Sequence, residues 1–404
     1  MQTYPNLRHV RLFDRAVATG SLSKAADSVR VSQPAASQAL AKLEEHFGGP
    51  LFERRGSGVH PTPRGMIVAA RTGRVLATLR AANLRLARQL RPDRIIAGDL
   101  LETHATIAHL RAIAGFARVG SFSGAARQME QAEPSVQRAA RDLERLSGAE
   151  LFEGKHQSLR LTATGAMMAV CASLVLQELE SASVEVRELD GSFDGRIVIG
   201  SLPLIRTGIV PDAIAALVGR RPRASIEILD GSYDVLMHGL LIGDIDILLG
   251  ALREHDTDKG VTQEALFSDG LSVVARSGHP LFSQGKVSPA DLARYPWVLP
   301  RKRTPTRELF DALVKGLGLH LPDTGVIETG SLGAIRGILI KTDRLTMLSR
   351  RQILYEEQAG LLGVVDVELP AMARPIGITT RAGWKPTALQ EEFLSALREA
   401  ARTQ

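Results

Sequence analysis

The side chains that could carry out catalysis in this sequence do not combine into a catalytic set. The ten histidines include no HExxH pattern and no run with the single cysteine, Cys171, that would suggest zinc ligands. Ser201 lacks the Gly-x-Ser-x-Gly turn that exposes a nucleophilic serine, and the sequence has neither a P-loop nor a GxGxxG after a strand. We therefore expect no enzyme, no metal site and no cofactor.

What the sequence does carry is an uneven distribution of positive charge. Residues 1–66 contain 9 Lys and Arg against 5 Asp and Glu, and residues 67–95 contain 7 against 1. Residues 101–166 have 8 against 7, residues 167–195 have 1 against 6, and the chain from 196 onward has 25 against 24. A basic excess confined to the first 95 residues is typical of a surface that binds a polyanion.

Length and composition fit an ordinary globular protein of two to four domains. The chain has 404 residues, of which 44% are apolar and 23% charged. One cysteine excludes an intrachain disulfide and suits a reducing cytosol, where Cys171 would serve as a small packing residue. The longest nearly apolar stretch, 166–176, is too short to span a bilayer, so we expect no membrane partner and a cytoplasmic location.

The most informative pattern is a repeat at a constant offset of 100 residues. Gly20-Ser21-Leu22-Ser23-Lys24-Ala25-Ala26 returns as Gly120-Ser121-Phe122-Ser123-Gly124-Ala125-Ala126, and the register holds to the pair Gly65 and Gly165. Two copies are too few for a solenoid, which needs about three or more repeats. The pattern therefore predicts one compact module, duplicated ahead of a different domain.

Each copy must be built from short helices and a strand pair. In copy 1, helical spacing predicts a first helix that ends at Gly20, a second that Ser23 caps and that runs through Val29, and a third that starts at Ser32. The third helix would bury Ala36, Ala39, Leu40 and Leu43. Residues 48–55 and 60–65 predict a wing of two strands. The unit is thus a winged helix-turn-helix, whose recognition helix lies in the major groove.

At these residues the sequence resembles the LysR-type transcriptional regulators. The resemblance rests on the residues 20–26 already quoted and on four further strings: Ser32-Gln33-Pro34-Ala35-Ala36-Ser37, Leu43-Glu44, Leu51-Phe52-Glu53-Arg54 and Thr62-Pro63-Arg64-Gly65. It implies a DNA-binding protein that recognises double-stranded promoter DNA, responds to a small molecule and forms a homodimer or homotetramer through its linker helices. RNA polymerase is a further candidate partner.

The resemblance also implies which residues of copy 1 face DNA. They are Ser32, Gln33, Pro34, Ser37, Gln38 and Lys42 on the third helix, with Arg54 and Arg55 on the wing. The chemistry is suitable, because glutamine can pair with an adenine edge, serine and lysine can hold phosphates, and arginine suits a narrow minor groove. The alternative is that Ser32 is only a helix cap and that the arginines are only solvated surface.

Copy 2 keeps the framework positions and changes the DNA-facing ones. Residues 32–37, Ser-Gln-Pro-Ala-Ala-Ser, become Ala-Glu-Pro-Ser-Val-Gln at 132–137, and Arg54 becomes Gly154. A carboxylate at Glu133 would repel phosphates. We expect copy 2 to act mainly as a scaffold or dimerisation surface. The alternative is that it reads a second sequence through Arg138, Arg141 and Lys155, with Glu133 accepting from a cytosine amino group.

A long helix follows each copy. Linker 1, residues 67–95, carries a stripe of Leu76, Leu79, Asn83, Leu86 and Leu90, and linker 2, residues 167–192, carries Ala172, Val175, Leu179, Ala182, Val186 and Leu189. Such a stripe forms a coiled-coil seam or packs on its own domain. Asn83 interrupts the first stripe and could fix its register. Because linker 1 is basic and linker 2 acidic, we hypothesise that they pair with each other, within one chain or across a dimer.

From residue 195 the pattern changes to alternating strands and helices. A βαβαβ rhythm through 250 predicts a parallel sheet with a ligand crevice beyond its strand ends. The region resembles the two-lobed effector domain of the same family, itself similar to periplasmic solute-binding proteins, through Ile245-Asp246-Ile247 and Gly278-His279-Pro280-Leu281. Within the family, three segments look most like the galactose-binding-protein regulator subgroup: residues 203–207, 230–233 and 295–301.

The resemblance places an effector, a sugar or an organic acid, between the two lobes. The candidate contacts are Ser201, Arg206, Ser232, Arg301, Thr329 and Ser331. Free amides at the helix start beside Ser331 would favour an anion. An ordinary capping or surface role is the alternative for each.

The predicted architecture is a multidomain α+β and α/β protein. Copy 1 spans 1–66, linker 1 67–95, a connector 96–108, copy 2 109–166 and linker 2 167–192. The effector domain spans 195–404, with lobe I at about 195–269 and 372–404 and lobe II at about 270–371.

Overall fold

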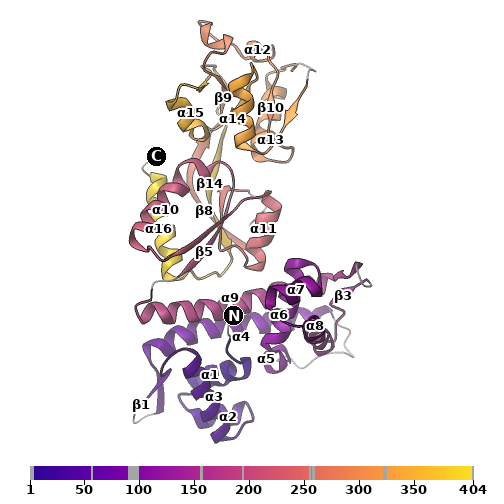
Figure 1. Ribbon diagram of the computed structural model, residues 1–404, viewed down its shortest axis with the longest axis vertical. Coiled ribbons are helices and arrows are strands. Elements are labelled where there is room, and N and C mark those ends of the chain that lie inside the picture. The colour runs from indigo at the N-terminus through magenta and orange to yellow at the C-terminus, as the bar shows by residue number, and fades with distance from the viewer. Residues whose placement is uncertain are drawn as a thin grey trace. The chain divides into compact units, whose positions relative to one another are not determined.

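The computed structural model describes residues 4–55, 58–89, 100–154, 158–192, 195–253, 256, 260–321 and 325–402. The chain forms two compact units. Unit 1 comprises Met1–Gly195 and Leu241–Asp244, and unit 2 comprises Arg196–Leu240 and Ile245–Gln404. Unit 1 holds both helix-turn-helix copies and their linkers, and unit 2 holds the sheet-containing domain (Figure 1).

Copy 1 has the predicted order of three helices, a wing and a long helix. Its elements are α1 (Leu7–Thr19), α2 (Leu22–Ser28), α3 (Gln33–His46), β1 (Phe52–Arg55), β2 (Gly58–Pro61) and α4 (Pro63–Gln89). One detail of the prediction was wrong. Ser21, and not Ser23, caps α2 by accepting from the Lys24 amide, so α2 begins two residues earlier than a cap at Ser23 would place its start.

Copy 2 repeats these elements almost residue for residue. They are α6 (Ile107–Val119), α7 (Phe122–Met129), α8 (Glu133–Ser147), β3 (Phe152–Glu153), β4 (Arg160–Leu161) and α9 (Ala163–Leu189), preceded by α5 (Leu100–His104). The helices α1 and α6, α2 and α7, α3 and α8, and α4 and α9 start 100 residues apart. The repeat in the sequence is therefore a repeat of the fold.

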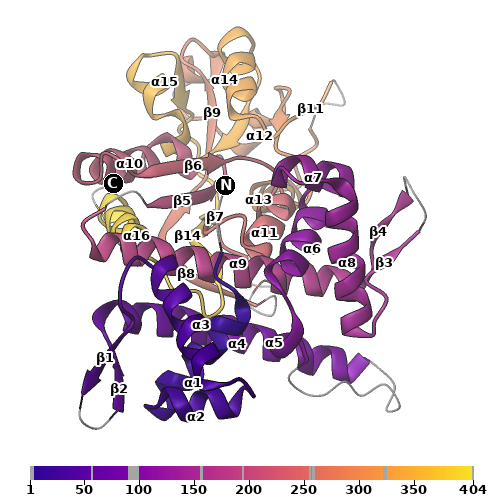
Figure 2. The ribbon, with the colours of Figure 1, turned by 60° about the horizontal axis from the view of Figure 1, so that its bottom comes forward.

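The two linker helices, α4 and α9, pack against each other along their length within one chain (Figures 1 and 2). Arg64 at the start of α4 meets Asp190 just past the end of α9, and Thr78 in the middle of α4 meets Cys171. The contacts run in opposite directions along the two helices, so the pair is antiparallel. The hypothesis that linker 1 pairs with linker 2 is confirmed, in its intrachain form.

The seam between these helices is built from the predicted stripes, with two corrections. Leu76, Leu79 and Leu86 of α4 are buried, as are Ala172, Val175, Leu179, Ala182 and Val186 of α9. Leu189 is exposed, since α9 ends there, and Leu90 lies outside the described residues. Asn83 is buried, and its Oδ1 accepts from the Leu101 amide at 3.2 Å. It thus holds the start of α5 and is not simply a register-setting residue of the seam.

Buried ion pairs cross the seam. Arg71 of α4, 3% exposed, donates to Glu185 Oε2 at 2.9 Å and to Glu178 Oε2 at 3.1 Å. Arg74 reaches the same Glu178 oxygen at 3.0 Å. Burial alone would lower the pKa of Arg71, but Glu185 and Glu178 raise it above its ordinary value. The guanidinium therefore stays charged inside the seam.

Cys171 packs in this seam as the sequence predicted. Its Sγ lies 3.8 Å from the Thr78 carbonyl oxygen, and burial raises the pKa of the thiol to about 12. Among the described residues α9 is the one helix long and apolar enough to cross a membrane, where the sequence predicted none. Its apolar side chains are accounted for by the core of unit 1, which they share with α4. The apolar surface of α9 is thus used for packing.

Unit 2 begins with a five-stranded sheet in the order β6-β5-β7-β14-β8. Strands β5 (Arg196–Ser201), β6 (Ser225–Leu229) and β7 (Ile247–Ala251) are parallel, as predicted. Strand β14 (Ala373–Arg381) runs antiparallel to both of its neighbours, β7 and β8 (Val261–Gly270). The sheet is therefore mixed. Helices α10 (Ile209–Arg220) and α16 (Ala388–Arg402) pack together on one side, and α11 (Tyr233–Ile242) lies on the other (Figure 1).

The second lobe of unit 2 lies between β8 and β14 in the sequence. It contains an antiparallel sheet, β12-β9-β13, and a parallel pair, β10-β11. The strands are β9 (Ser272–Arg276), β10 (Val298–Leu299), β11 (Ile327–Glu328), β12 (Thr346–Leu348) and β13 (Leu362–Val364). The helices are α12 (Pro289–Leu292), α13 (Pro305–Gly316), α14 (Leu332–Lys341) and α15 (Leu354–Gln358), with short 3-10 turns η5 (Pro280–Ser283) and η6 (Arg350–Ile353).

Removing the charge of Arg71 should destabilise unit 1 strongly. In an Arg71→Met chain Glu185 loses its partner in a partly buried site, and we expect unfolding to become easier by about 3–5 kcal/mol. Hydrogen exchange of the α4 and α9 amides measures this effect locally. The matched control is Arg160→Met, because Arg160 and Glu153 form an exposed wing pair whose loss should cost less than about 1 kcal/mol. Equal protection of α4 and α9 in the two variants would contradict the buried pair.

Candidate nucleic-acid interface and effector site

The helix α3 of copy 1 presents all six of its predicted DNA-facing residues to solvent. Ser32, Gln33, Pro34, Ser37, Gln38 and Lys42 are exposed. Ala36 and Leu43 on the opposite side are buried, and Ala36 packs with Leu12 and Ala16 of α1. Ser32 also caps α3 by accepting from the Ala35 amide at 3.4 Å. The structure thus gives Ser32 both a capping role and an accessible position.

A set of contacts fixes the wing relative to the recognition helix. Glu44 Oε1 accepts from the Leu51 amide at 2.9 Å, and the Thr62 hydroxyl donates to the Pro50 carbonyl at 2.8 Å. Gly65 packs so closely that a Cβ there would lie 2.0 Å from the Leu51 carbonyl oxygen. A side chain is therefore excluded at this position, which explains a glycine at the start of the linker helix.

The wing arginines occupy one strand of a hairpin. In β1, Arg54 pairs with Val59 and Arg55 pairs with Gly58 across the antiparallel register. The side chains of both arginines lie outside the described residues. The Val59 amide donates to the Gly20 carbonyl at 3.0 Å, which joins the wing to the turn after α1.

Copy 2 reproduces this framework bond for bond. Glu144 Oε1 accepts from the Leu151 amide at 2.9 Å, the Thr162 hydroxyl donates to the Glu150 carbonyl at 2.7 Å, and a Cβ on Gly165 would lie 2.0 Å from the Leu151 carbonyl oxygen. The residues that both copies share are therefore those that fold the module. They carry no information about whether the module binds DNA.

The outer face of α8 differs from that of α3. Ala132 gives α8 no side-chain cap, and Glu133 occupies its first turn, where a carboxylate favours the helix dipole. Of the predicted second face, Arg138 is exposed, whereas Arg141 pairs with Glu144 at 2.6 Å and lies over the Phe152 ring. Lys155 lies outside the described residues.

A second change removes positive charge from copy 2. Lys42 of α3 corresponds to Asp142 of α8, and Asp142 pairs with Arg145. Copy 2 therefore holds two of its arginines, Arg141 and Arg145, in ion pairs on their own helix. Arg138 is the exposed arginine of α8 for which the structure shows no ion pair within the described part of the chain.

The effector candidates fall into two groups, one in each lobe of unit 2. Ser201 ends β5, is 0% exposed, and its hydroxyl has no hydrogen-bond partner among the described residues. Arg206 lies in the 3-10 turn η3 (Ile205–Thr207) and pairs with Asp230 at 3.4 Å. Ser232 is exposed and accepts from the Val235 amide at the start of α11. These three follow the carboxyl ends of β5 and β6.

The second group surrounds the start of α14. Ser331 caps α14 by accepting from the Ala334 amide, and the Thr329 hydroxyl accepts from the Ser331 amide at 3.1 Å. Arg301 lies beside this segment, since a Cβ on Gly330 would be 3.8 Å from its Nε. The structure thus brings Arg301, Thr329 and Ser331 together. Capping accounts for part of the polar chemistry of Thr329 and Ser331.

Sequence reasoning missed the side chain that joins the two groups. Arg336 of α14 donates to the Thr207 hydroxyl of η3 at 3.4 Å and to the Gln352 carbonyl at 3.1 Å, and it pairs with Glu356 at 3.1 Å. Thr207 is the neighbour of Arg206. Nothing in the local sequence around Arg336 signals this role, because its partners are distant in the chain.

The two motifs that suggested the effector domain have structural roles. Asp246 is buried and accepts from the Val198 amide at 2.8 Å, and burial raises its pKa. His279 is buried, its Nδ1 accepts from the Leu281 amide at 3.1 Å, and burial lowers its pKa. No group of three or more His, Cys, Asp or Glu side chains is placed to hold a metal ion in the described parts of the chain.

Comparisons with known protein families agree with this arrangement. Residues 7–66 and 107–166 both match the family described as "Bacterial regulatory helix-turn-helix protein, lysR family". Residues 190–402 match the "LysR substrate binding domain". The two helix-turn-helix matches fall on copy 1 and copy 2, the second match beginning two residues before the predicted residue 109, and the third match covers most of unit 2.

Individual relatives match the chain over most of its length. The chain is 31% identical over 401 residues to the HTH-type transcriptional regulator GalR of Pseudomonas putida, covering 99% of this chain and 98% of that protein. It is 25% identical to GbpR of Azospirillum brasilense, covering 77% of this chain and 91% of that protein. The alignment with GalR thus runs through both copies.

Solved structures share the fold. A full-length OxyR variant from Pseudomonas aeruginosa superposes with a TM-score of 0.57 at 21% identity, covering 74% of this chain and 95% of that chain. Full-length CbnR, crystallised with its target DNA, superposes with a TM-score of 0.50 at 18% identity, covering 73% of this chain and 99% of that chain.

The caps of α3 and α8 offer a reciprocal test of the framework. Ser32→Ala should destabilise the first turn of α3 by about 1 kcal/mol, because its side-chain cap is lost. Ala132→Ser should stabilise the first turn of α8 by a similar amount. The backbone at both positions is extended, as a cap requires. Hydrogen exchange at the first-turn amides of each helix measures both changes. If Ala132→Ser did not slow exchange in the first turn of α8, the backbone at residue 132 would not have the capping conformation found at Ser32.

Proposed function

The chain belongs to the LysR family of bacterial transcriptional regulators, and we propose that α3 of copy 1 is its sequence-reading helix while copy 2 serves mainly as a scaffold. The chain is a DNA-binding regulator with an effector-binding domain and not an enzyme. The observation that carries the proposal is the difference between the two outer faces. Copy 1 exposes six polar or small residues, and the side chain of Gln33 among them has no hydrogen-bond partner within the described residues. Copy 2 exposes Glu133 and holds Arg141 and Arg145 of α8 in ion pairs.

The roles of individual residues follow from their chemistry. Gln33 and Gln38 can donate and accept at adenine edges, and Ser32, Ser37 and Lys42 can hold phosphate oxygens. Pro34 fixes the first turn of α3 without requiring an amide bond. Arg54 and Arg55 would follow the DNA backbone from the wing. A regulator of this kind acts on chromosomal DNA, so we place it in the cytoplasm.

One observation favours the second candidate function, in which both copies read DNA. Arg138 is exposed at the position of Gln38 and has no ion pair within the described residues. An arginine there could contact guanine or phosphate. This role would make the chain a reader of two different half-sites.

Matched substitutions separate the two candidates on the promoter beside the protein's own gene. Gln33→Ala should weaken specific binding by about 1–3 kcal/mol, or roughly 5- to 150-fold, and leave nonspecific binding unchanged. Arg138→Ala should leave the affinity and the length of the footprint unchanged if copy 2 is a scaffold. Fluorescence anisotropy and footprinting provide both readouts. A footprint shortened by Arg138→Ala would establish copy 2 as a second reader.

We further propose that unit 2 binds an anionic or sugar-like effector between the two groups of candidate residues. Ser201 supports this, because its hydroxyl is buried and without a partner in the described residues, a state that costs free energy unless a ligand or water satisfies it. Arg206 and Ser232 would act beside it. Arg301, Thr329 and Ser331 would contact the ligand from lobe II. Closure on a ligand would then shift the population of DNA-bound states.

A serine-to-alanine pair tests the effector proposal. Full-length protein is screened by thermal shift against galactose, galacturonate and benzoate, which represent a sugar, a sugar acid and an aromatic acid. A compound that stabilises the wild type should bind Ser201→Ala about tenfold more weakly, because one hydrogen bond is lost. Ser283→Ala, exposed at the end of η5, should respond as wild type does. A Ser201→Ala response equal to wild type would remove Ser201 from the site.

A further inference from the structure

The contacts between α4 and α9 are not interchangeable between the two helices. The repeat relates Arg71 to Cys171, Glu178 to Thr78 and Glu185 to Arg85. Arg71 therefore meets two carboxylates, whereas Cys171, its counterpart on the other helix, meets the backbone of Thr78. The ion pairs of Arg71 therefore have no counterpart at the position that the repeat relates to it, Cys171.

Pairing two copies of the same linker would lose these interactions. In an antiparallel pair of two α4 helices, Arg71 would face Thr78 and Arg85, which places like charges together in a buried seam. In a pair of two α9 helices, Cys171 would face Glu178 and Glu185 with no cation. Unpaired charges inside such a seam are strongly destabilising. The charges thus favour the unlike pair and disfavour both like pairs.

Further contacts tie each copy to the other copy's linker. Arg80 of α4 donates to both carboxylate oxygens of Glu102 in α5, at 2.9 Å each, and Asn83 of α4 holds the Leu101 amide. Near the N-terminus, burial and the carboxylate of Glu180 in α9 raise the pKa of Tyr4 to about 12. The start of copy 2 is thus anchored on linker 1, and the start of copy 1 lies near linker 2.

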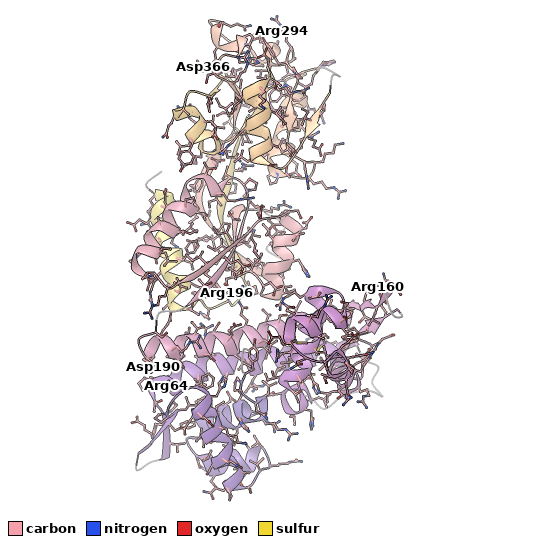
Figure 3. All side chains as sticks on the ribbon, in the orientation of Figure 1. Arg64, Arg160, Asp190, Arg196, Arg294 and Asp366 are labelled. Atoms are coloured by element: carbon pink, nitrogen blue, oxygen red, sulfur yellow. The ribbon has the colours of Figure 1, made fainter. Side chains whose placement is uncertain are left out.

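At the end of the pair, Arg64 and Asp190 form a bidentate contact, with Nη1 to Oδ2 at 3.0 Å and Nη2 to Oδ1 at 2.6 Å (Figure 3). By the repeat, the corresponding pair at the other end would be Thr164 and Leu90, which carry no charge. Arg64 also donates to the Phe47 carbonyl, so the contact reaches the end of α3. Asp190 of linker 2 therefore helps to position the recognition helix of copy 1.

We infer that a single chain supplies both modules of a winged helix-turn-helix pair, and that the stretch of DNA beneath this pair has no two-fold symmetry. This inference rests on the proposed function, because it requires that the chain bind DNA. A dimer with two identical heads matches a palindromic site. Here the two modules of one chain differ at Gln33 and Glu133 and at Lys42 and Asp142. The stretches of DNA beside the two modules therefore cannot be equivalent. Because α4 and α9 already cover each other within the chain, any additional chain would have to join through another surface.

A crosslinking experiment tests the intrachain pairing in solution. The full-length Arg64→Cys/Asp190→Cys double variant is prepared with light and with heavy isotopes, mixed, refolded together and treated with a short bis-maleimide. Cys171 is buried and should not react. We expect crosslinked peptides that are wholly light or wholly heavy. We also expect the crosslinked double variant to bind promoter DNA as tightly as the uncrosslinked double variant does. Mixed light–heavy peptides, or loss of DNA binding on crosslinking, would overturn the inference.

A pair of DNA-cleaving probes tests the missing symmetry. Ser23 of α2 and Ser123 of α7 are equivalent in the repeat, and both are exposed. Ser23→Cys and Ser123→Cys chains each carry an iron chelate that cleaves nearby DNA. We expect the copy 1 probe to cut beside one half-site of each neighbouring pair and the copy 2 probe to cut beside the other half-site or not at all. If either probe marks both neighbouring half-sites, the site is symmetric and the inference is wrong.

The two experiments also separate this inference from the proposed function. A chain that binds no promoter DNA in any form contradicts the DNA-binding proposal, whatever the crosslinks show. A chain that binds DNA but gives mixed light–heavy crosslinks leaves the regulator proposal intact and rejects the single-chain unit.

Discussion

The arrangement of unit 1 depends on the charge of Arg71 between Glu178 and Glu185. A guanidinium inside a helix seam is tolerated only where carboxylates from the facing helix satisfy it. Because those carboxylates lie on α9 and not on α4, the pair forms between unlike helices. The pairing fixes the two helix-turn-helix copies in one body, since each copy continues directly into one of the helices. The position of α3 therefore depends on a contact far from the DNA-facing surface.

A single DNA-binding module must both fold and present a DNA-contacting face, and with two copies in one chain these two requirements need not be met by the same copy. The framework demands a glycine beside the Leu51 carbonyl, a carboxylate on the Leu51 amide and a threonine at the linker start, and copy 2 retains all three as Gly165, Glu144 and Thr162. The outer face demands hydrogen-bonding and basic groups, and copy 2 lost several of them. If copy 2 serves as a scaffold, as we propose, its outer face can change as long as its core still supports α9.

Much of this fold could be predicted from the sequence, because it depends on local patterns and on the repeat. The offset of 100 identified both modules, and the opposite charges of the linkers indicated their pairing. The cap of α2 at Ser21 and the capping of α5 by Asn83 were missed, since neighbouring serines look alike and the partner of Asn83 is 18 residues away. Strand β8 and its antiparallel pairing with β14 also depend on distant contacts. The role of Arg336 arises from three segments that no local pattern connects.

Only linker 2 leads into unit 2, and this connection limits how an effector could act on the two helix-turn-helix copies. Linker 2 continues into β5 after residue 195, whereas linker 1 leads into copy 2, so one effector domain serves two helix-turn-helix copies. If one chain is the DNA-binding unit, a single bound ligand supplies all of the free energy that biases that unit. The bias is then limited by the difference in affinity of one site for two states. Any steeper response requires that separate chains be coupled through other surfaces, because the linker helices are already paired within each chain.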